Sequence, residues 1–437
     1  PIYHLFHPAK DLGAPYDPNS AIYYKGRYHL HYIYRNRAGI SYAHVSSQDM
    51  VRWEWHPTVL VPQENGHGMF SGTAFLTREG TPAHAYCGWG SNRNWIQHAL
   101  DDNLNKWSKP EVMLPRDKSG KLMVNEPYFD PDVWIMDGIY YGLNGRSSHQ
   151  PPLIMKSENL RDWVHIGELL HPEFDEDKLG VSMDEDISCP NFFKLGDKWI
   201  LTCISHKLGC RYFIGEFKNE QFLPEYHAVL GGNSRRYFAP ESLLTPDGRR
   251  VNWSWFIQGN NNDNRGTQSL PTEMSLTTKG EMRLRPIVEL EKLRFGEKQR
   301  IKIFIKENST VIPDDMQGDH GEIKLEVGQS GSQSFGINVL CDEKGENGLR
   351  IKINREKNLL EVGNQNGDFT LNSNEQLSLR IFVDACLVEV FANEKQVVMA
   401  DKKRPAGSKI NPYISLFNEG ADLQVDRLSF WNMKSAY

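Results

Sequence analysis

The chain has 437 residues, of which 39% are hydrophobic and 24% are charged, and its formal net charge at pH 7 is −6. These proportions are those of a globular protein, and at about 150 residues per domain the length suggests two or three domains. The negative charge excludes nucleic acid as an expected partner, because binding a polyanion needs a basic surface. We expect no membrane span, since no apolar run approaches the roughly 20 residues that cross a bilayer.

Short hairpins recur along the first two thirds of the chain. In each, an aromatic or β-branched run leads through a glycine-containing turn into a second such run, which is typical of a β-hairpin. The turn glycines lie 52 to 58 residues apart and are Gly26, Gly80, Gly138, Gly196 and Gly248.

A tryptophan motif repeats in step with these hairpins. Three segments place an acidic or amide residue five positions before a Trp: Gln48–Trp53, Asp102–Trp107 and Glu158–Trp163. Repeats of fifty-odd residues with about four short strands each are typical of a β-propeller. Five such periods fit residues 1–294, so we expect a five-bladed propeller there.

Beyond residue 294 the pattern changes to an alternation of apolar and polar residues. It covers short runs at 301–305, 323–327, 349–353, 377–383 and 388–391. Short strands with one apolar face indicate an antiparallel β-sandwich. The predicted fold is therefore all-β, with a five-bladed β-propeller of residues 1–294 followed by a β-sandwich of residues 295–437. We expect the sandwich to act as a stability or dimer element in a monomer or homodimer.

Carboxylates stand just before four of the predicted hairpins, near the propeller axis where ligands bind. They are Asp17, Asp130, the run Asp184–Asp186 and Glu241. Paired carboxylates in an aromatic-rich funnel are what glycoside hydrolysis requires, because one attacks the anomeric carbon and another protonates the leaving oxygen.

Three motifs around these acids resemble those of glycoside hydrolase family 32, the invertases, inulinases, levanases and other β-fructofuranosidases. Tyr16–Ser20 is similar to the family's Asn-Asp-Pro-Asn-Gly motif, Phe129–Pro131 to Arg-Asp-Pro, and Ser188–Pro190 to Glu-Cys-Pro. Further matching segments follow in family order: His44–Glu54, Phe70–Thr73, Phe238–Glu241, Leu270–Leu276, Leu379–Asp384, Val388–Phe391 and Ile414–Phe417. The resemblance covers almost the whole chain. It implies a five-bladed propeller with a β-sandwich and a retaining cleavage of terminal β-fructofuranosides.

The resemblance assigns two of the three carboxylates that the family uses. It makes Asp17 the nucleophile and Asp130 the group that grips sugar hydroxyls and stabilises the oxocarbenium-like transition state. The third, the acid/base Glu, falls on Ser188. A serine hydroxyl has a pKa far above neutrality, so it does not replace that acid.

Three neighbouring carboxylates are candidates for the missing acid. Asp186 stands two residues before Ser188, so on an extended strand both side chains would share one face, about 6–7 Å apart. Glu241 enters from the next blade. Glu185 would point to the opposite face unless the segment bulges. We favour Asp186, with Glu241 second and Glu185 third.

The shell expected around the sugar also departs from the family. Tyr16 stands for Asn, Ile33 for Gln, Phe129 for Arg and Arg236 for Asp. Arg236 would lower the pKa of a nearby carboxylate or bind an anionic substrate group. Trp95 is favoured as a sugar platform because polar residues surround it. The expected substrate-binding residues are Tyr16, Asn19, Phe70, Ser71, Trp95, Phe129, Glu185, Ser188 and Arg236.

Three functions remain open at this point. The first is an exo-acting hydrolase of a terminal β-fructofuranoside, or a related furanoside, of the sucrose or fructan type. The second is a silent carbohydrate-binding homologue, because Ser188 replaces the acid. The third is a fructosyl transferase or cyclising enzyme. In each, the partner is an oligo- or polysaccharide.

The six cysteines indicate neither a disulfide framework nor a zinc site, because none forms a Cys-x-x-Cys pair and no His has zinc-finger spacing from them. We expect buried free thiols, no metal and no cofactor. The chain begins Pro1-Ile2-Tyr3, without the charged and apolar segments of a signal peptide. Either a signal was removed or an initiator Met is missing, and we favour secretion or the periplasm over the cytoplasm.

Overall fold

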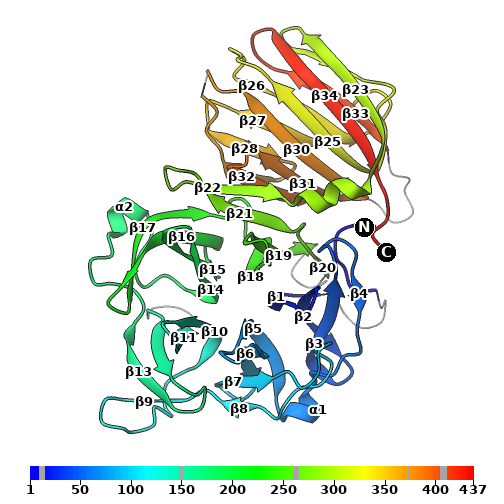
Figure 1. Ribbon diagram of the computed structural model, residues 1–437. Coiled ribbons are helices and arrows are strands. Elements are labelled where there is room, and N and C mark those ends of the chain that lie inside the picture. The colour runs from blue at the N-terminus through cyan, green and yellow to red at the C-terminus, as the bar shows by residue number, and fades with distance from the viewer. Residues whose placement is uncertain (9–14, 147–150, 259–264, 373, 404–410) are drawn as a thin grey trace.

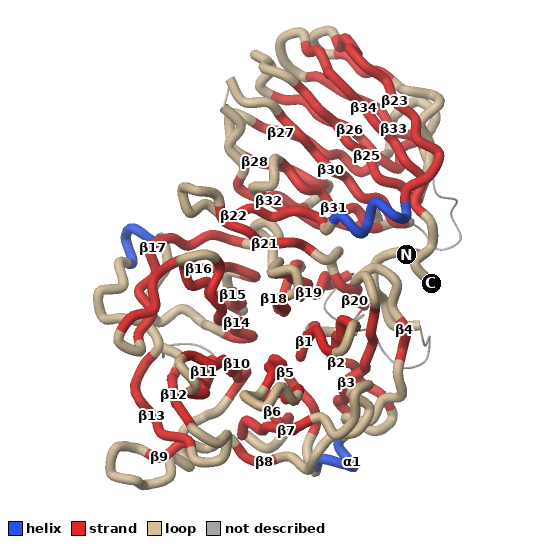
Figure 2. The backbone as a smooth tube through the Cα atoms, viewed as in Figure 1, coloured by secondary structure: helices blue, strands red, loops and turns tan. Residues whose placement is uncertain are grey.

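The structure is a computed structural model of residues 1–437, and it describes all of them except 9–14, 147–150, 259–264, 373 and 404–410. Strands dominate the described part of the chain, and its helices are short (Figure 2). These helices are α1 (Pro62–Asn65), α2 (Glu176–Leu179) and the 3₁₀ helix η1 (Val288–Leu293).

Five sheets follow one another along the chain and surround a common axis (Figure 1). The first contains β1 (Pro18–Tyr24), β2 (Arg27–Asn36), β3 (Gly39–Ser47) and β4 (Glu54–Trp55). The second contains β5 (Gly68–Leu76), β6 (Pro82–Trp89), β7 (Arg93–His98) and β8 (Glu111–Val112). The third contains β10 (Phe129–Met136), β11 (Ile139–Gly145), β12 (Leu153–Ser157), β13 (Trp163–Glu168) and, parallel to β13, β9 (Pro115–Arg116). The fourth contains β14 (Ser188–Leu195), β15 (Lys198–Ser205), β16 (Gly209–Lys218) and β17 (Gln221–Val229). The fifth contains β18 (Tyr237–Leu244), β19 (Arg250–Gln258), β21 (Thr272–Leu276), β22 (Met282–Pro286) and β20 (Arg265–Gln268), which pairs with β19.

The first strand of each sheet lies innermost, and these five strands form a closed ring. β1 contacts β5, β5 contacts β10, β10 contacts β14, β14 contacts β18, and β18 returns to β1. This closure is the architecture of a propeller.

A buried hydrogen bond from a side chain crosses every junction of this ring, and we call these five the closure bonds. Written from donor to acceptor, they are Gly72 N to Asn19 Oδ1 (2.7 Å), Thr73 Oγ1 to Asp132 Oδ1 (2.7 Å), Phe192 N to Asp132 Oδ2 (2.6 Å), Ser242 N to Asn191 Oδ1 (2.7 Å) and Ala21 N to Glu241 Oε1 (2.7 Å). Each satisfies a buried polar group that the pairing within the blades leaves open.

Two six-stranded sheets form the rest of the chain. One runs in the order β23 (Arg294–Ile305), β34 (Leu423–Met433), β25 (His320–Val327), β30 (Leu377–Asp384), β31 (Leu387–Ala392) and β32 (Gln396–Asp401). The other runs in the order β24 (Ser309–Val311), β33 (Tyr413–Asn418), β26 (Ser334–Cys341), β27 (Leu349–Asn354), β28 (Leu359–Val362) and β29 (Gln365–Asp368). Alternate residues of both sheets, such as Ile323, Leu325, Ile337 and Ile351, fill one shared core. The predicted all-β fold, a propeller followed by a sandwich, is confirmed.

The N-terminal segment ties the two parts together. Asp384 on β30 accepts the backbone N–H groups of Ile2 (2.7 Å), Tyr3 (3.0 Å) and His4 (2.9 Å). The buried His4 ring bridges Asp384 and Glu389. The change of architecture occurs across η1, and the proposed division between residues 294 and 295 falls at the start of β23.

We expect Glu241→Ala to lower the free energy of unfolding by about 2–5 kcal/mol, because it leaves two buried donors, Ala21 N–H and the Asn191 amide, without an acceptor. Denaturant unfolding followed by tryptophan fluorescence measures the change. The exposed Glu173→Ala is the control, with an expected change within about 0.5 kcal/mol. An equal, small effect of both substitutions would contradict the closing role of Glu241.

Candidate active site

One ring of strand ends surrounds a cavity of about 290 Å³ on the propeller axis. β1, β10 and β14 begin at Pro18, Phe129 and Ser188, so Asp17, Asp130 and Ser188 reach the same cavity. Tyr16, Phe70 and Ser71 complete the group of expected residues that line it.

The backbone is irregular where these strands begin. All five innermost strands show a register shift near that end. Four non-glycine residues there have positive φ: Ser20 (48°), Asp130 (38°), Cys189 (47°) and Ala239 (47°). A bulge re-aims the side chains of its strand, and such strained residues gather at functional sites.

Asp17 is held by several hydrogen bonds and is only 9% exposed. Its Oδ2 accepts from Ser71 Oγ (3.2 Å) and lies 3.7 Å from Cys189 Sγ. Its carbonyl accepts from Ile33 N (3.0 Å) and from Asn19 Nδ2 (2.8 Å). Burial, followed by the negative charge of Asp130, raises the pKa of Asp17 to about 6.

Asp130 is the second buried carboxylate of the cavity. Its Oδ2 accepts the backbone N–H of Cys189 at 2.8 Å. Burial raises the pKa of Asp130, while this hydrogen bond favours the ionised form. The ionised forms of the two acids are therefore stabilised by their hydrogen bonds, while burial and, at Asp17, the charge of Asp130 oppose ionisation.

Asp186 takes part in a network that suits a permanent anion and not a proton donor. Ser188 Oγ donates to its Oδ1 at 2.6 Å, and His206 contacts its Oδ2 through the backbone N–H (2.8 Å) and ring Nδ1 (2.5 Å). Burial raises the pKa of Asp186, but these hydrogen bonds outweigh it and lower the pKa overall. A lowered pKa is the wrong direction for the acid proposed from the sequence.

The structure places all three acid candidates, Asp186, Glu241 and Glu185, outside the lining of the cavity. Glu241 carries the closure bond between β18 and β1, and it lines a separate space of about 10 Å³. Burial raises the pKa of Glu241 to about 8, and both of its oxygens accept hydrogen bonds, from Ala21 N and Asn191 Nδ2. Glu185 accepts from Ser205 Oγ at 2.5 Å.

Four expected substrate-binding residues also lie away from the lining of the cavity. Asn19 makes a closure bond. Trp95 stacks on His67 with ring centroids 4.5 Å apart, and the Phe129 N–H donates to Asn144. Arg236 pairs with Asp401 on β32 at 2.6 Å, so its charge is used between propeller and sandwich.

Several lining residues were missed by the sequence analysis. They are Arg35, Ile40, Trp89, Cys189, Ile204, His206, Phe238 and Trp255. Trp89, 52% exposed and packed on Phe70, is the exposed indole at the mouth. His206 stands in the turn between β15 and β16 and belongs to no recognisable motif. Its position in a turn was therefore the only feature of the sequence that could have indicated a role in the site.

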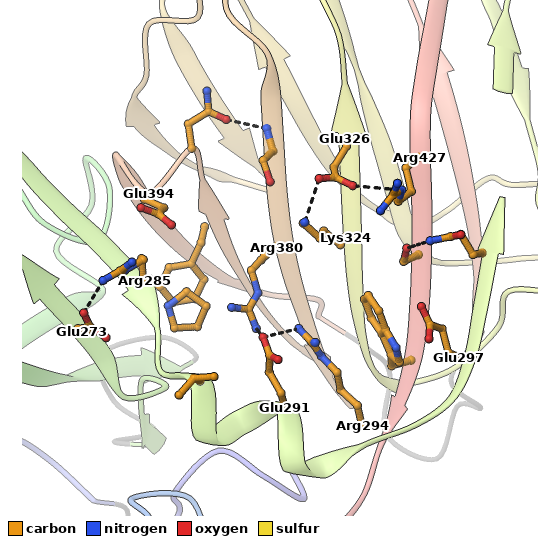
Figure 3. Close-up of a pocket in the computed structure, with 18 residues that line it drawn as sticks. Glu273, Arg285, Glu291, Arg294, Glu297, Lys324, Glu326, Arg380, Glu394 and Arg427 are labelled. Atoms are coloured by element: carbon orange, nitrogen blue, oxygen red, sulfur yellow. Dashed lines mark hydrogen bonds and ion pairs between the residues drawn. The ribbon is translucent and has the colours of Figure 1, made fainter. Parts of the chain in front are cut away.

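A larger cavity of about 740 Å³ lies between the propeller and the sandwich (Figure 3). Its charged side chains pair with one another: Arg285 with Glu273 (2.5 Å), Lys324 with Glu326 (2.9 Å) and Arg294 with Glu291 (3.2 Å). None of the expected catalytic residues lines it. We therefore place the candidate active site on the propeller axis.

Among the described residues, no group of three His, Cys, Asp or Glu side chains could hold a metal ion. Within that same part of the chain, no helix is long and apolar enough to cross a membrane.

Removing the charge of Asp130 tests the coupling between the two buried acids. We expect Asp130→Asn to lower the pKa of Asp17, because the Asp130 charge raises it. Carboxyl ¹³C NMR titration measures this, with Asp17 ionising as the pH rises through about 6 in the unchanged protein. Asp137→Asn, in an exposed turn of the same blade, should leave that titration in place. An unmoved Asp17 titration in Asp130→Asn would refute the coupling.

Comparisons with known proteins identify the family of this chain. Residues 6–286 match the glycosyl hydrolases family 32 N-terminal domain, and residues 289–432 match the glycosyl hydrolases family 32 C-terminal domain. A sucrose-6-phosphate hydrolase of Zymomonas mobilis is 25% identical, with 90% of this chain and 84% of that protein covered. A levanase of Bacillus subtilis is 26% identical, with 100% and 71% covered.

The fold is similar to solved structures as well. The crystal structure of fructan 1-exohydrolase IIa from Cichorium intybus matches with a TM-score of 0.82 at 18% identity, covering 99% of this chain and 98% of that one. Exo-inulinase from Aspergillus awamori matches with a TM-score of 0.79 at 19% identity, covering 100% and 98%. Because the two family models together span most of the sequence, the chain belongs to glycosyl hydrolases family 32.

Proposed function

We propose that this family 32 glycosidase removes a terminal β-fructofuranosyl unit, or a related furanosyl unit, from an oligo- or polysaccharide with retention of configuration. The observation that carries the proposal is the pair of buried carboxylates, Asp17 and Asp130, at one cavity. The names of the relatives, which include sucrose-6-phosphate hydrolase, levanase and raffinose invertase, support a fructosyl substrate.

In this proposal Asp17 is the nucleophile. Its ionised carboxylate attacks the anomeric carbon, the bond to the leaving oxygen breaks, and a glycosyl ester forms that water then hydrolyses. A pKa of about 6 leaves Asp17 largely ionised at neutral pH. Asp130, held by the Cys189 N–H, accepts hydrogen bonds from sugar hydroxyls and stabilises the positive charge that develops on the ring.

The small volume of the cavity favours action at a chain end. Its volume of about 290 Å³ lies near the lower limit of the roughly 300–1,000 Å³ of small-molecule sites. Such a space holds one sugar unit against aromatic walls formed by Tyr16, Phe70 and Trp89.

A second candidate is carbohydrate binding without turnover. Ser188 supports it, since its hydroxyl donates to Asp186 and supplies no acid. A substrate with an activated leaving group separates the two candidates, because it needs no protonation. Transfer or cyclisation would appear as a fructosylated or anhydro product in NMR analysis of the reaction mixture.

We expect Asp17→Asn to lower kcat/KM for para-nitrophenyl β-fructofuranoside by about 10³-fold or more, because no ester forms. Release of nitrophenol measures the rate, and sucrose, inulin and levan are assayed beside it. Asp137→Asn is the matched control and should keep the activity of the unchanged protein. Turnover that survives equally in both variants would refute the role of Asp17, and binding of sugars without any turnover would favour the second candidate.

We expect Trp89→Ala to raise KM by about 3- to 10-fold with a smaller change in kcat, because an aromatic contact contributes roughly 0.5–1.5 kcal/mol. Steady-state kinetics on the best of these substrates measures the split. Leu244→Ala, an exposed apolar residue outside the cavity, is the control. An unchanged KM for Trp89→Ala would show that the sugar does not use this ring.

A further inference from the structure

We propose that His206 is the general acid/base of this enzyme and that Asp186 positions it, with Ser188 in support. This inference rests on the proposed function and names the group that replaces the missing glutamate. It assigns a residue that no family motif in the sequence contains.

The location of His206 is the first support. It occupies the turn that joins β15 to β16, and its ring lines the same cavity as Asp17, Asp130 and Ser188. Its side chain is 68% exposed, whereas Asp186 behind it is 8% exposed. A group at the mouth of the cavity is placed to meet the leaving part of a sugar whose ring is bound at the floor.

The second support is the way Asp186 holds the ring. One carboxylate oxygen of Asp186 accepts the backbone N–H of His206 and also forms a hydrogen bond with its ring Nδ1. Because Nδ1 is engaged, Nε2 is the ring nitrogen that can exchange a proton with a ligand. An anion on one ring nitrogen fixes the orientation of a catalytic histidine and stabilises its imidazolium form.

The third support is that hydrogen bonds from other residues fix the position of Asp186. Ser188 Oγ donates to its other oxygen at 2.6 Å, and Arg211 donates to its backbone carbonyl. Ser205 Oγ donates to Glu185 and accepts the N–H groups of Lys207 (3.0 Å) and Leu208 (2.9 Å), which fixes the turn. Ser188, which stands where the family has its acid, thus holds Asp186, the anion that positions His206.

The charges around the ring favour its protonated form. The hydrogen bond from Asp186 raises the pKa of His206, burial opposes this, and the charges of Asp186, Asp130 and Asp17 raise it further. Two of the cations nearby donate to backbone atoms: Arg235 to the His206 carbonyl at 3.2 Å, and Arg211 to the Asp186 carbonyl. A third, Arg35, lines the same cavity and is exposed. A proton donor near neutral pH is what the first step requires.

Both halves of the reaction balance with these groups. In the first, Asp17 attacks the anomeric carbon, and the imidazolium Nε2–H gives its proton to the leaving oxygen as that C–O bond breaks. In the second, neutral Nε2 takes a proton from water as the water oxygen attacks the anomeric carbon. The ester bond to Asp17 breaks, the carboxylate is regenerated, and His206 returns to imidazolium.

The same three side chains do not form a serine nucleophile triad. In such a triad the histidine stands between the serine and the acid. Here the aspartate stands in the middle, with Ser188 on one oxygen and His206 on the other.

The decisive experiment compares His206→Ala with Lys207→Ala, its exposed neighbour in the same turn, on two leaving groups. For a sugar leaving group such as that of sucrose, His206→Ala should lose about 10²- to 10⁴-fold in kcat/KM, the usual contribution of a general acid. For the para-nitrophenyl fructoside the loss in kcat/KM should be less than about 10-fold, because that leaving group needs no proton. Lys207→Ala should match the unchanged protein on both.

Azide tests the base step. It attacks the glycosyl ester without giving up a proton, so it should restore turnover of the para-nitrophenyl fructoside by His206→Ala and yield a fructosyl azide of retained configuration. Equal losses on both substrates, or no effect of azide, would overturn the assignment. If the unchanged protein turns over both substrates through Asp17 and His206→Ala keeps its full kcat/KM on sucrose, only this inference fails. If the unchanged protein turns over neither substrate, the proposed function fails with it.

Asp186→Asn tests the positioning role separately. It should move the alkaline limb of kcat/KM to lower pH, because it removes the anion that raises the pKa of His206. The ¹H NMR titration of the His206 ring should move in the same direction, which gives a readout independent of turnover. A His206 titration that does not move in Asp186→Asn would overturn the pairing.

Discussion

Closure of the innermost strands is the constraint on which the rest of this structure depends. Five first strands meet in a ring, and each junction is crossed by a buried hydrogen bond from a side chain such as Asn19, Asp132 or Glu241. A propeller blade alone leaves these polar groups without partners, and burying them unpaired would cost about 1–3 kcal/mol each. Closure satisfies all of them together and brings the strand ends to one axis.

The cavity chemistry follows from that closure. Asp17 and Asp130 stand far apart in sequence, yet the ring places both at one cavity, where burial and the charge of Asp130 raise the pKa of Asp17, and burial and the charge of Asp186 raise the pKa of Asp130. Folding tolerates the repulsion because hydrogen bonds from Ser71 and the Cys189 N–H favour the ionised forms. The result is a nucleophile that ionises near pH 6 in a small cavity with aromatic walls.

In the proposed mechanism, the acid/base group moves to another residue within the family's fold. Ser188 stands at the start of β14 and lines the cavity, and its hydroxyl donates to Asp186. Asp186 in turn holds a histidine from the next hairpin. Proton transfer would then depend on two elements, the start of β14 and the β15–β16 turn, and a substrate chosen by this pocket would meet an imidazole where the family presents a carboxyl group.

The sequence by itself determined the fold class, because a repeat of fifty-odd residues and a later alternation of period two are local patterns that one chain displays directly. It also located Asp17 and Asp130, since each adjoins a proline in a recognisable motif. Only the tertiary structure decided which charged side chains line the cavity and which bind elsewhere: Asp186 contacts His206, Glu241 closes the ring, and Arg236 pairs with Asp401 of the sandwich. Spacing along an extended strand predicted that Asp186 and Ser188 share a face about 6–7 Å apart, whereas Asp186 lies before β14 and accepts a hydrogen bond from Ser188 at 2.6 Å. The spacing carried no information about partners 20 or 165 residues away, because such contacts are set by how blades and sheets pack.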